Sequence, residues 1–438
     1  MVKHIDQVPV VHVPENFPYV MPSCMAQAAL EYGPIFKVDW PPMRQVICMI
    51  GQEANKLVFH THQDHFSHEK GWASYTHILL GRSLLNMDGP EHIYYRKLMN
   101  PSMTGKSTSG YIGVINEVIQ DQIKTWRQAM TLDIYEESRA IAFAIIARVI
   151  LGLQDTEEIE ALREGFHCLV NPEYGLHEVT PQRLLDRLHA QDIVNKILLT
   201  HIKRRRRGLQ DERSILLDLL IRKPGWMGQP LNNEAILSHL RTLIAAGHET
   251  TALVSSWLLY LLATHPSYLD RVLQEFKALP DEAQNSLTLE HIKAMPVLGY
   301  AITEAARLYG PTGNLPRGVV KDFEFGGYMI PASTLIVVSV AGCHRLPQFF
   351  ERPEEFDPDR FAPPREEDKR HPYALAIFGG GPHMCLGFNF AQIELKAIAF
   401  HVLHSYVLEP VTPQNIEMAY FSPDGFLPRG LKMHVRQR

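Results

Sequence analysis

The stretch "FGGGPHMCLG", Phe378 to Gly387, places a single cysteine, Cys385, among four glycines and a proline. The run that follows it, 388–407, has the spacing of an amphipathic helix. Glycines let a backbone pass close to a large flat group, and the first turn of a helix directs its free N–H groups back toward the residue before it. We therefore predict that Cys385 is held as a thiolate.

The composition excludes several classes of protein. The chain has 438 residues, of which 45% are apolar and 21% charged, and its net charge of -5 lacks the basic surplus of a nucleic-acid-binding protein. The cysteines are odd in number and show no CxxC spacing, which argues against a disulfide framework or a zinc site: Cys24, Cys48, Cys168, Cys343 and Cys385. The first twenty residues mix prolines and charges with apolar residues, unlike a signal peptide or a membrane span. We expect a soluble cytoplasmic protein with no membrane anchor and no nucleic-acid partner.

The order of periodic segments predicts a mainly α fold with a small β region. Runs 33–40 and 44–51 resemble two strands of a hairpin, and 51–62 resembles a helix. Helical periodicity covers about 107–128, 135–152, 156–170, 182–207, 211–222, 267–278 and 292–309. Residues 315–342 alternate like a small sheet. With neither an internal repeat nor a linker, residues 1–438 read as a single domain.

The longest predicted helix spans 233–265 and ends where Pro266 stops it. At 1.5 Å per residue it would be about 50 Å long and could cross the whole molecule. Residues 352–384 form a turn-rich stretch without periodicity, which is unusually long for a loop without a function. We expect contacts with a cofactor there. The basic run 203–207 ends a predicted helix and is interpreted as a solvated helix end.

Position by position, "FGGGPHMCLG" resembles the haem-binding loop of the cytochrome P-450 family. A second match lies in the middle of the longest helix, where "AAGHETT" resembles the family's oxygen-activation motif with Glu249 as the acid and Thr250 as the alcohol. Gly247 would permit the close approach of a flat cofactor, and Thr250 can direct its hydroxyl to the carbonyl four residues earlier. An ordinary solvent-facing Glu-Thr pair is the alternative when the motif is taken alone.

Two further segments resemble a structural cluster of the family. In "EAAR", Glu304 and Arg307 are three residues apart on a predicted helix and can pair. Such pairs are usually solvated and worth about 0–1 kcal/mol. Arg360, in "FDPDRF", resembles the third member of the family's Glu-Arg-Arg cluster, which holds the cysteine loop in place.

Four basic residues from separate segments resemble the family's contacts to the two haem carboxylates. His92 and Arg96 are four residues apart on one predicted helix, which suits two donors aimed at one carboxylate. Arg317, in "GNLPRGVV", and His383, two residues before the cysteine, match two more of these contacts. The sequence departs from the family pattern at Met103, where an aromatic residue is usual, and at His344, where many bacterial members have asparagine.

The resemblance implies a fold in which haem b lies between the long central helix and the cysteine-loop helix. Cys385 would be the proximal iron ligand. Glu249 and Thr250 would be catalytic, and the remaining cofactor contacts would come from Ala246, Gly247, Phe378, Gly379 and Gly387. The implied activity is that of a monooxygenase, which hydroxylates or epoxidises an apolar substrate with one oxygen atom from O2.

The resemblance also implies partners. The sequence contains no flavin or iron–sulfur segment, so electrons are expected from a separate ferredoxin and its reductase, and the protein is expected to be a monomer. The segments expected to line the substrate pocket are 71–85, 171–180, 312–316 and 421–426, together with Leu243, Ile244 and Ala246. They are mostly apolar or aromatic, which leaves fatty acids, terpenoids, steroids and polyketides open.

Three alternatives remain at this point. A peroxide-driven peroxygenase would use the same haem, although such enzymes usually lack the acid–alcohol pair formed here by Glu249 and Thr250. A haem-thiolate protein that only binds or senses a ligand would show no turnover. A cofactor-free helical protein would simply bury Cys385.

Overall fold

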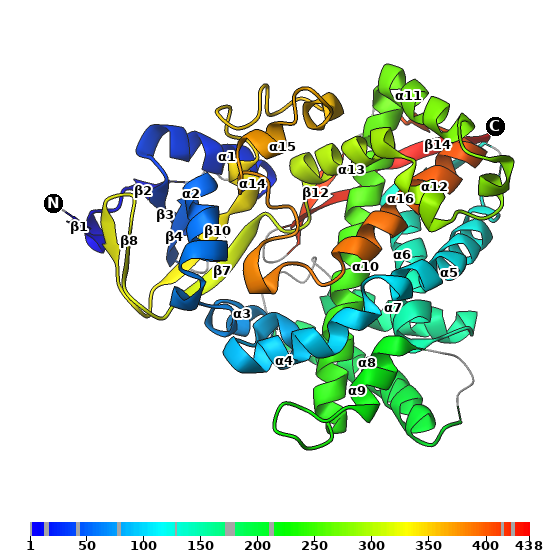
Figure 1. The fold of residues 1–438 in the computed structure, drawn as a ribbon, viewed down its shortest axis with the longest axis horizontal. Helices are drawn as coiled ribbons and strands as arrows, with labels where there is room; N and C mark the ends of the chain where they lie inside the picture. The colour runs from blue at the N-terminus through cyan, green and yellow to red at the C-terminus, as the bar shows by residue number, and fades with distance from the viewer. Residues whose placement is uncertain are drawn as a thin grey trace.

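The computed structural model describes residues 2–12, 17–40, 44–76, 80–127, 129–170, 180–209, 214–412, 416–421 and 425–438. Figure 1 shows a sheet-rich part built mostly from the N-terminal strands and the yellow strands near residue 330, beside a larger helical part. The termini lie at opposite sides of the molecule in this view. The predicted mainly α fold with a small β region is confirmed.

The largest sheet has the strand order β2-β3-β4-β10-β7-β5. Its predicted hairpin is present, because β3 (Ile35–Trp40) runs antiparallel to β4 (Arg44–Ile50). Strand β10 (Leu335–Ser339) lies parallel to β4 and antiparallel to β7 (Asn314–Val319). Side chains of this sheet form a second hydrophobic core, separate from that of the helices. Every residue of β7 is buried, so the strand carries its charged residue into the interior.

The smaller strands complete three further sheets. The N-terminal strand β1 (Lys3–His4) pairs with β9 (Tyr328–Ile330), which pairs with β8 (Phe323–Phe325). At the other end, β14 (Lys432–Gln437) lies between β11 (Tyr406–Pro410) and β6 (Met130–Asp133). The remaining strands are β2 (Val10–Val11), β5 (Phe66–Ser67), β12 (Glu417–Phe421) and β13 (Gly425–Arg429).

Helix α10 (Asn233–Thr264) is the long central helix that the sequence predicts, and it has 32 residues. It begins where the Asn232 side chain accepts a hydrogen bond from the Ala235 N–H, and it ends before Pro266, the first residue of α11 (Pro266–Lys277). It packs against α6, α13 and α16 (Figure 1), and most of its side chains are buried. An apolar helix without a solvent face is typical of the centre of a large core.

The other helices that the sequence predicts lie close to their predicted positions, with one exception, whereas the helices Phe17–Tyr32, His68–Thr76, Val340–Cys343 and Glu367–Arg370 were not predicted. Their bounds are α1 (Phe17–Tyr32), α2 (Gln52–Lys56), α3 (His68–Thr76), α4 (Gly89–Met99), α5 (Lys106–Ile123), α6 (Ile134–Leu151), α7 (Thr156–Val170), α8 (Pro181–Arg206), α9 (Ile215–Arg222), α14 (Val340–Cys343), α15 (Glu367–Arg370) and α16 (Phe388–Ser405). The basic run 203–207 falls at the end of α8, as expected. None of the helices that the structure describes is long and apolar enough to cross a bilayer.

The exception is the predicted helix 292–309, which is two helices. The first, α12 (Leu289–Lys293), ends at Ala294, and the second, α13, spans Pro296–Tyr309. Pro296 has no N–H to donate to a preceding turn, so it suits the first position of a new helix and not the interior of a continuous one. The apolar periodicity runs through both helices, which is why it did not reveal the break.

Candidate functional site

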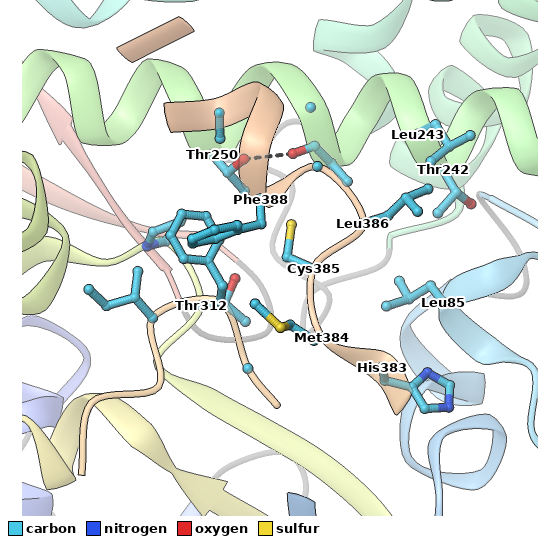
Figure 2. A pocket seen from close by; sticks show the side chains of 18 of the residues that line it. Leu85, Thr242, Leu243, Thr250, Thr312, His383, Met384, Cys385, Leu386 and Phe388 are labelled. Carbon is cyan, nitrogen blue, oxygen red and sulfur yellow. Dashed lines mark hydrogen bonds between the residues drawn. The ribbon is translucent and has the colours of Figure 1, made fainter. Parts of the chain in front are cut away.

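One cavity of about 810 Å³ lies between α10 and the loop that contains Cys385. Figure 2 shows Cys385 and Met384 of this loop facing the same space as Thr250 of α10 and Thr312. Other parts of the wall come from α3, α4, β7 and α8. No Asp or Glu occurs among the described residues that line it, so its charged groups are all basic.

The cysteine loop is shaped by its own backbone. The Cys385 N–H donates to the Phe378 carbonyl at 2.9 Å, and the Met384 N–H donates to the Gly381 carbonyl at 3.1 Å. Gly387 is the N-cap of α16, which therefore begins directly after the loop. The ring of Phe378 meets Phe388 edge to face, with ring centroids 4.8 Å apart. These contacts fold the loop so that the Cys385 side chain is exposed to the cavity (Figure 2).

Two glycines of the loop have a packing role that the sequence did not predict. Gly379 and Gly381 have positive φ angles of 68° and 67°, which non-glycine residues rarely adopt. A Cβ on Gly381 would lie 2.3 Å from the carbonyl oxygen of Phe59, and one on Gly380 would lie 2.9 Å from the Phe59 side chain. Gly380 and Gly381 thus allow the loop to pack on η2 (Leu57–Thr61).

The thiolate at Cys385 stays a prediction. Burial raises the pKa of the Cys385 thiol, and the Gly387 N–H and the Arg96 guanidinium offset part of this effect. A coordinating metal ion deprotonates a thiol outright, so a metal ion bound at Cys385 would hold the sulfur as a thiolate.

The four predicted basic residues come together beside the loop. His92 and His383 stack with ring centroids 3.6 Å apart, and both line the cavity with Arg96 and Arg317. Arg96 donates to the backbone carbonyls of Met384 and Cys385, which ties α4 to the loop. His68 was not predicted from the sequence. Its ring stacks on the other face of His383, with the two ring centroids 3.3 Å apart. His68 lies in no motif, so no signal in the sequence marked it.

The electrostatics of this cluster suit an anion. Arg317 is 3% exposed, donates to the Pro316 carbonyl at 2.8 Å, and has its pKa lowered to about 9 by burial. The Nε2 atom of His92 is buried without a hydrogen-bond partner in the described structure. Asp88 is the nearby acid, 3.9 Å from His383, but it already accepts hydrogen bonds from Ser67 and from the N-terminus of α3. The guanidinium groups of Arg96 and Arg317 thus have one nearby carboxylate, that of Asp88, which already accepts hydrogen bonds from other groups. Their positive charge can therefore bind a second anion.

On the opposite wall, Ala246, Gly247 and Thr250 of α10 line the cavity. The Thr250 hydroxyl donates to the Ala246 carbonyl at 2.6 Å, as predicted. Gly247 also has a packing role that the sequence did not predict, because a Cβ there would lie 2.8 Å from Cδ1 of Ile146. The glycine allows α10 to pack closely on α6. Leu243 also lines the cavity, whereas Ile244 is fully buried in the core and does not.

Glu249 is directed away from the cavity, contrary to the expected catalytic position. Its carboxylate accepts hydrogen bonds from Tyr135 at 2.6 Å and from Arg139 at 2.8 and 3.0 Å, and its side chain is 2% exposed. His248 lies 3.2 Å away. Burial raises the pKa of Glu249, but His248, Arg139 and Tyr135 outweigh it and hold the pKa below its usual range. Glu249 therefore joins α10 to α6 as an ionised, buried group.

Behind the loop, Glu304, Arg307 and Arg360 form one fully buried ionic cluster. Arg307 donates to Glu304 at 2.7 Å and Arg360 donates to it at 3.0 Å, with all three side chains at 0% exposure. Arg307 also donates to the His344 carbonyl at 2.8 Å. The cluster joins α13 to η8 (Pro358–Phe361) and the turns around it.

Two residues, Met103 and His344, differ from those usual in the family. His344 is buried, and its Nε2 accepts a hydrogen bond from the Ala376 N–H at 3.0 Å, two residues before the cysteine loop. Met103 lines the cavity. Of the segments expected at the substrate pocket, residues 77–79, 171–179 and 422–424 lie outside the described part of the chain.

Comparisons with known proteins agree with this geometry. The sequence model of the cytochrome P-450 family matches residues 16–434. The chain is 28% identical over 390 residues to cytochrome P-450 120 of Synechocystis, covering 89% of this chain and 86% of the relative. It is 30% identical over 326 residues to the β-amyrin 28-monooxygenase of Barbarea vulgaris, covering 73% of this chain and 67% of that enzyme. A cyanobacterial member of the family, solved with retinoic acid bound, superimposes with a TM-score of 0.87 at 25% identity over 100% of both chains.

Proposed function

Because the chain belongs to the cytochrome P-450 family and is an oxidoreductase of the monooxygenase class, we propose that it inserts one oxygen atom from O2 into an apolar organic substrate by hydroxylation or epoxidation. The observation that carries the proposal is the position of Cys385, whose side chain faces a cavity of about 810 Å³ across from Thr250 (Figure 2). The names of two relatives, one acting on β-amyrin and one bound to retinoic acid, support an apolar substrate.

The residues of the cavity fit haem b. Its two carboxylates would be held by His92, Arg96, Arg317 and His383, the cluster that combines an unpartnered buried nitrogen with a desolvated guanidinium. Its faces would be contacted by Ala246 and Gly247 on one side and by Phe378, Gly379 and Gly387 on the other. Cys385 would ligate the iron, and the bound group supplies the electron-transfer and oxygen-activation chemistry of haem-thiolate enzymes.

Thr250 is the polar group of α10 that we propose to act at the oxygen site. Its hydroxyl proton is engaged by the Ala246 carbonyl, so its oxygen lone pairs face the cavity as acceptors. A water molecule or a protonated ligand held there would keep its proton close to the reacting oxygen. The Thr250 hydroxyl would thereby guide proton delivery and hold the oxygen-side water in place.

For Glu249 we propose a positioning role. Its contacts with Tyr135 and Arg139 fix the turn of α10 that presents Thr250 to the cavity. A direct part in proton entry would require its carboxylate to leave Arg139, a buried partner that is only 5% exposed. Losing such a partner inside a protein is costly, so this conformation favours the positioning role.

We further propose that residues 1–438 form one catalytic domain, which acts as a cytoplasmic monomer and takes electrons from a ferredoxin and its reductase. The cavity supports the first point, because its wall combines segments from His68 to Leu395. Members of this family typically take electrons from redox partners, which supports the part of the proposal that concerns the electron donor.

The experiment supplies purified holoenzyme with NADH, a ferredoxin and its reductase under ¹⁸O2, with a panel of apolar substrates. A product that carries one ¹⁸O atom and depends on NADH supports the proposed monooxygenase. Product formation only with added hydrogen peroxide would identify a peroxygenase instead. Ligand-induced spectral shifts without any product under either condition would identify a binding protein.

A further inference from the structure

Thr76, the last residue of α3, is a polar side chain of the cavity wall that the proposed haem contacts do not include. The residue is 5% exposed, and Leu80, Leu84 and Leu85 line the same cavity. Burying a hydroxyl is costly unless its hydrogen bonds are made. The partners of Thr76 therefore determine which polar group of a ligand could bind beside it.

The hydrogen bonds of Thr76 have a direction that their partners decide. The Thr76 hydroxyl donates to the Trp72 carbonyl at 3.1 Å, and its oxygen accepts a hydrogen bond from the Asn86 amide at 2.8 Å. The side-chain carbonyl of Asn86 accepts from the Ser83 N–H at 2.7 Å, which identifies the other side-chain atom of Asn86 as the donating nitrogen. A hydroxyl has one proton and two lone pairs, so Thr76 keeps one lone pair and no proton for a ligand.

The network behind Thr76 holds this acceptor in place. Ser83 and Asn86 are fully buried. Ser83 is bonded to the hydroxyl of Thr242 at 2.8 Å, so the network joins α3 and η4 (Leu84–Asn86) to the central helix α10. An acceptor that is already fixed by its neighbours loses little freedom when a ligand binds to it.

Other polar groups of the cavity are engaged within the protein or lie at the cysteine end. Thr250 and Thr303 donate to backbone carbonyls of their own helices. Arg187 and Trp72 line the cavity and already interact with other protein groups. Thr312 makes no hydrogen bond in the described structure, but it faces the same space as the cysteine (Figure 2). The wall at Thr76 thus presents an acceptor to a ligand.

An acceptor at Thr76 favours one class of polar group in the ligand. A ketone, an aldehyde or a carboxylate has only acceptor oxygens, so it would place a second acceptor against Thr76 and remain unpaired. An ammonium group could donate, but no acidic side chain lies among the described residues of the cavity wall to balance its charge. A hydroxyl donates a hydrogen bond without carrying a charge.

We propose that the substrate is an uncharged apolar alcohol whose hydroxyl donates a hydrogen bond to the side-chain oxygen of Thr76. This substrate class rests on the proposed monooxygenase function. The hydroxyl would fix one end of the substrate at the wall formed by α3. The hydrocarbon would fill the apolar space toward Leu243 and Thr250, which line the cavity on α10.

The test compares alcohols with their carbonyl counterparts as ligands of the holoenzyme. The probes are retinol against retinal and retinoic acid, and β-amyrin against β-amyrone, its 3-ketone. Dissociation constants are measured by calorimetry and by the shift of the Soret band. The variants are Thr76→Val, which removes the hydroxyl, and Thr76→Ser, which retains it. The control is Thr264→Val, because Thr264 donates to the Tyr260 carbonyl at 3.0 Å and does not line the cavity.

At least one alcohol should bind the wild-type protein about ten- to a hundredfold more tightly than its carbonyl counterpart, as expected when a buried acceptor is paired in one complex and unpaired in the other. Thr76→Val should remove this difference by weakening the alcohol alone, whereas Thr76→Ser and Thr264→Val should retain it. Carbonyl compounds that bind as tightly as their alcohols, alcohols that fail to bind, or a preference that survives in Thr76→Val would overturn the proposal.

The same proteins separate the substrate class from the proposed function. Every variant is first reduced under carbon monoxide, and the strongly red-shifted Soret band of a haem thiolate shows that the cavity is intact. A wild-type protein with this band but without a preference for alcohols would refute the role of Thr76 and leave the monooxygenase standing. A wild-type protein without the band would refute the haem-thiolate assignment, while calorimetry would still report whether Thr76 selects alcohols.

Discussion

At the scale of single residues, the adjacent residues Glu249 and Thr250 of α10 face different parts of the molecule. Thr250 faces the cavity, whereas Glu249 is buried against Tyr135 and Arg139. Successive residues of a helix point about 100° apart, and here this rotation directs Glu249 toward α6 while Thr250 is directed toward the cavity. The sequence motif identified the pair, but the partner of Glu249 comes from a helix more than a hundred residues earlier and left no local signal.

Replacing Thr250 by alanine should separate electron use from product formation. The variant loses the acceptor that faces the cavity and the hydrogen bond to Ala246, so protons reach the oxygen site without control. We expect the ratio of product formed to NADH consumed to fall several-fold. Thr264→Ala is the matched control, because Thr264 makes the same type of bond to the Tyr260 carbonyl at 3.0 Å outside the cavity. Equal ratios in both variants would contradict the role of Thr250.

Replacing Glu249 by glutamine should destabilise the fold. The change leaves the buried Arg139 with only the half-exposed Glu136 as a counter-charge, and breaking a buried pair typically costs about 3–5 kcal/mol. Urea unfolding at pH 7 measures this change in the free energy of unfolding. The control is Glu160→Gln, which removes a partly exposed ion pair with Arg163 and should cost about 0–1 kcal/mol.

The same pair predicts a pH dependence of the wild-type stability. The pKa of Glu249 is lower in the folded than in the unfolded chain, so the folded state holds fewer protons. The stabilisation that ionised Glu249 gives the folded state is fully present above the pKa of a glutamate in the unfolded chain, about 4.3. It is lost as the pH falls from there toward the lower pKa of Glu249 in the folded chain. The wild-type protein should therefore lose its stability advantage over Glu249→Gln in acid. A constant difference between the two proteins from pH 7 to pH 3 would argue against this assignment.

At the scale of elements, the cysteine loop depends on how closely it packs on η2. Gly381 combines a φ of 67° with a Cβ position 2.3 Å from the Phe59 carbonyl oxygen, so alanine fits neither the conformation nor the space. The glycine-rich motif predicted a tight loop, but the surface that it approaches lies more than 300 residues earlier. The contact with Phe59 therefore left no sign in the sequence, whereas the close approach to a cofactor stays a prediction.

Gly381→Ala should loosen the loop and weaken haem retention. The variant holoenzyme should release haem to apomyoglobin at least several times faster than the wild-type protein. The reason is that the Cys385 sulfur and the backbone hydrogen bonds of its loop would shift together. Gly110→Ala serves as the control, since that exposed position in α5 has open space for a Cβ and alanine favours a helix by about 1 kcal/mol. Unchanged release from Gly381→Ala would show that the contact with Phe59 does not hold the loop.

The helices themselves were largely predictable from the sequence, because their apolar periodicity and their proline boundaries are local. The long α10 was found within one residue at its end. The break between α12 and α13 was not found, since periodicity continues across Ala294 and Met295 and only the position of Pro296 marks it.

At the scale of the whole molecule, a buried ionic cluster connects segments that are distant in the chain. Glu304 binds Arg307 in its own helix and Arg360 beyond the sheet, and Arg307 reaches the His344 carbonyl. The spacing of Glu304 and Arg307 predicted only their pairing, which is weak on a surface. The resemblance to a known family supplied Arg360, because no periodicity relates positions 56 residues apart.

Arg360→Ala should unfold the molecule more easily than any surface charge replacement. It leaves Glu304 and Glu367 with a missing partner in the interior, and we expect a loss of about 3–5 kcal/mol. Thermal unfolding of the holoenzyme measures the change, with Arg271→Ala, at a half-exposed pair with Asp359, as the control. Similar midpoints for the two variants would mean that the cluster does not stabilise the fold.

Whether Cys385 ligates a haem iron is measured by the absorption spectrum of the dithionite-reduced protein with and without carbon monoxide. We expect a strongly red-shifted Soret band in the wild-type protein and its loss in Cys385→Ser, with Cys168→Ser as an unaffected control at an exposed cysteine. A spectrum typical of histidine ligation, or a red-shifted band that survives in Cys385→Ser, would contradict this ligation.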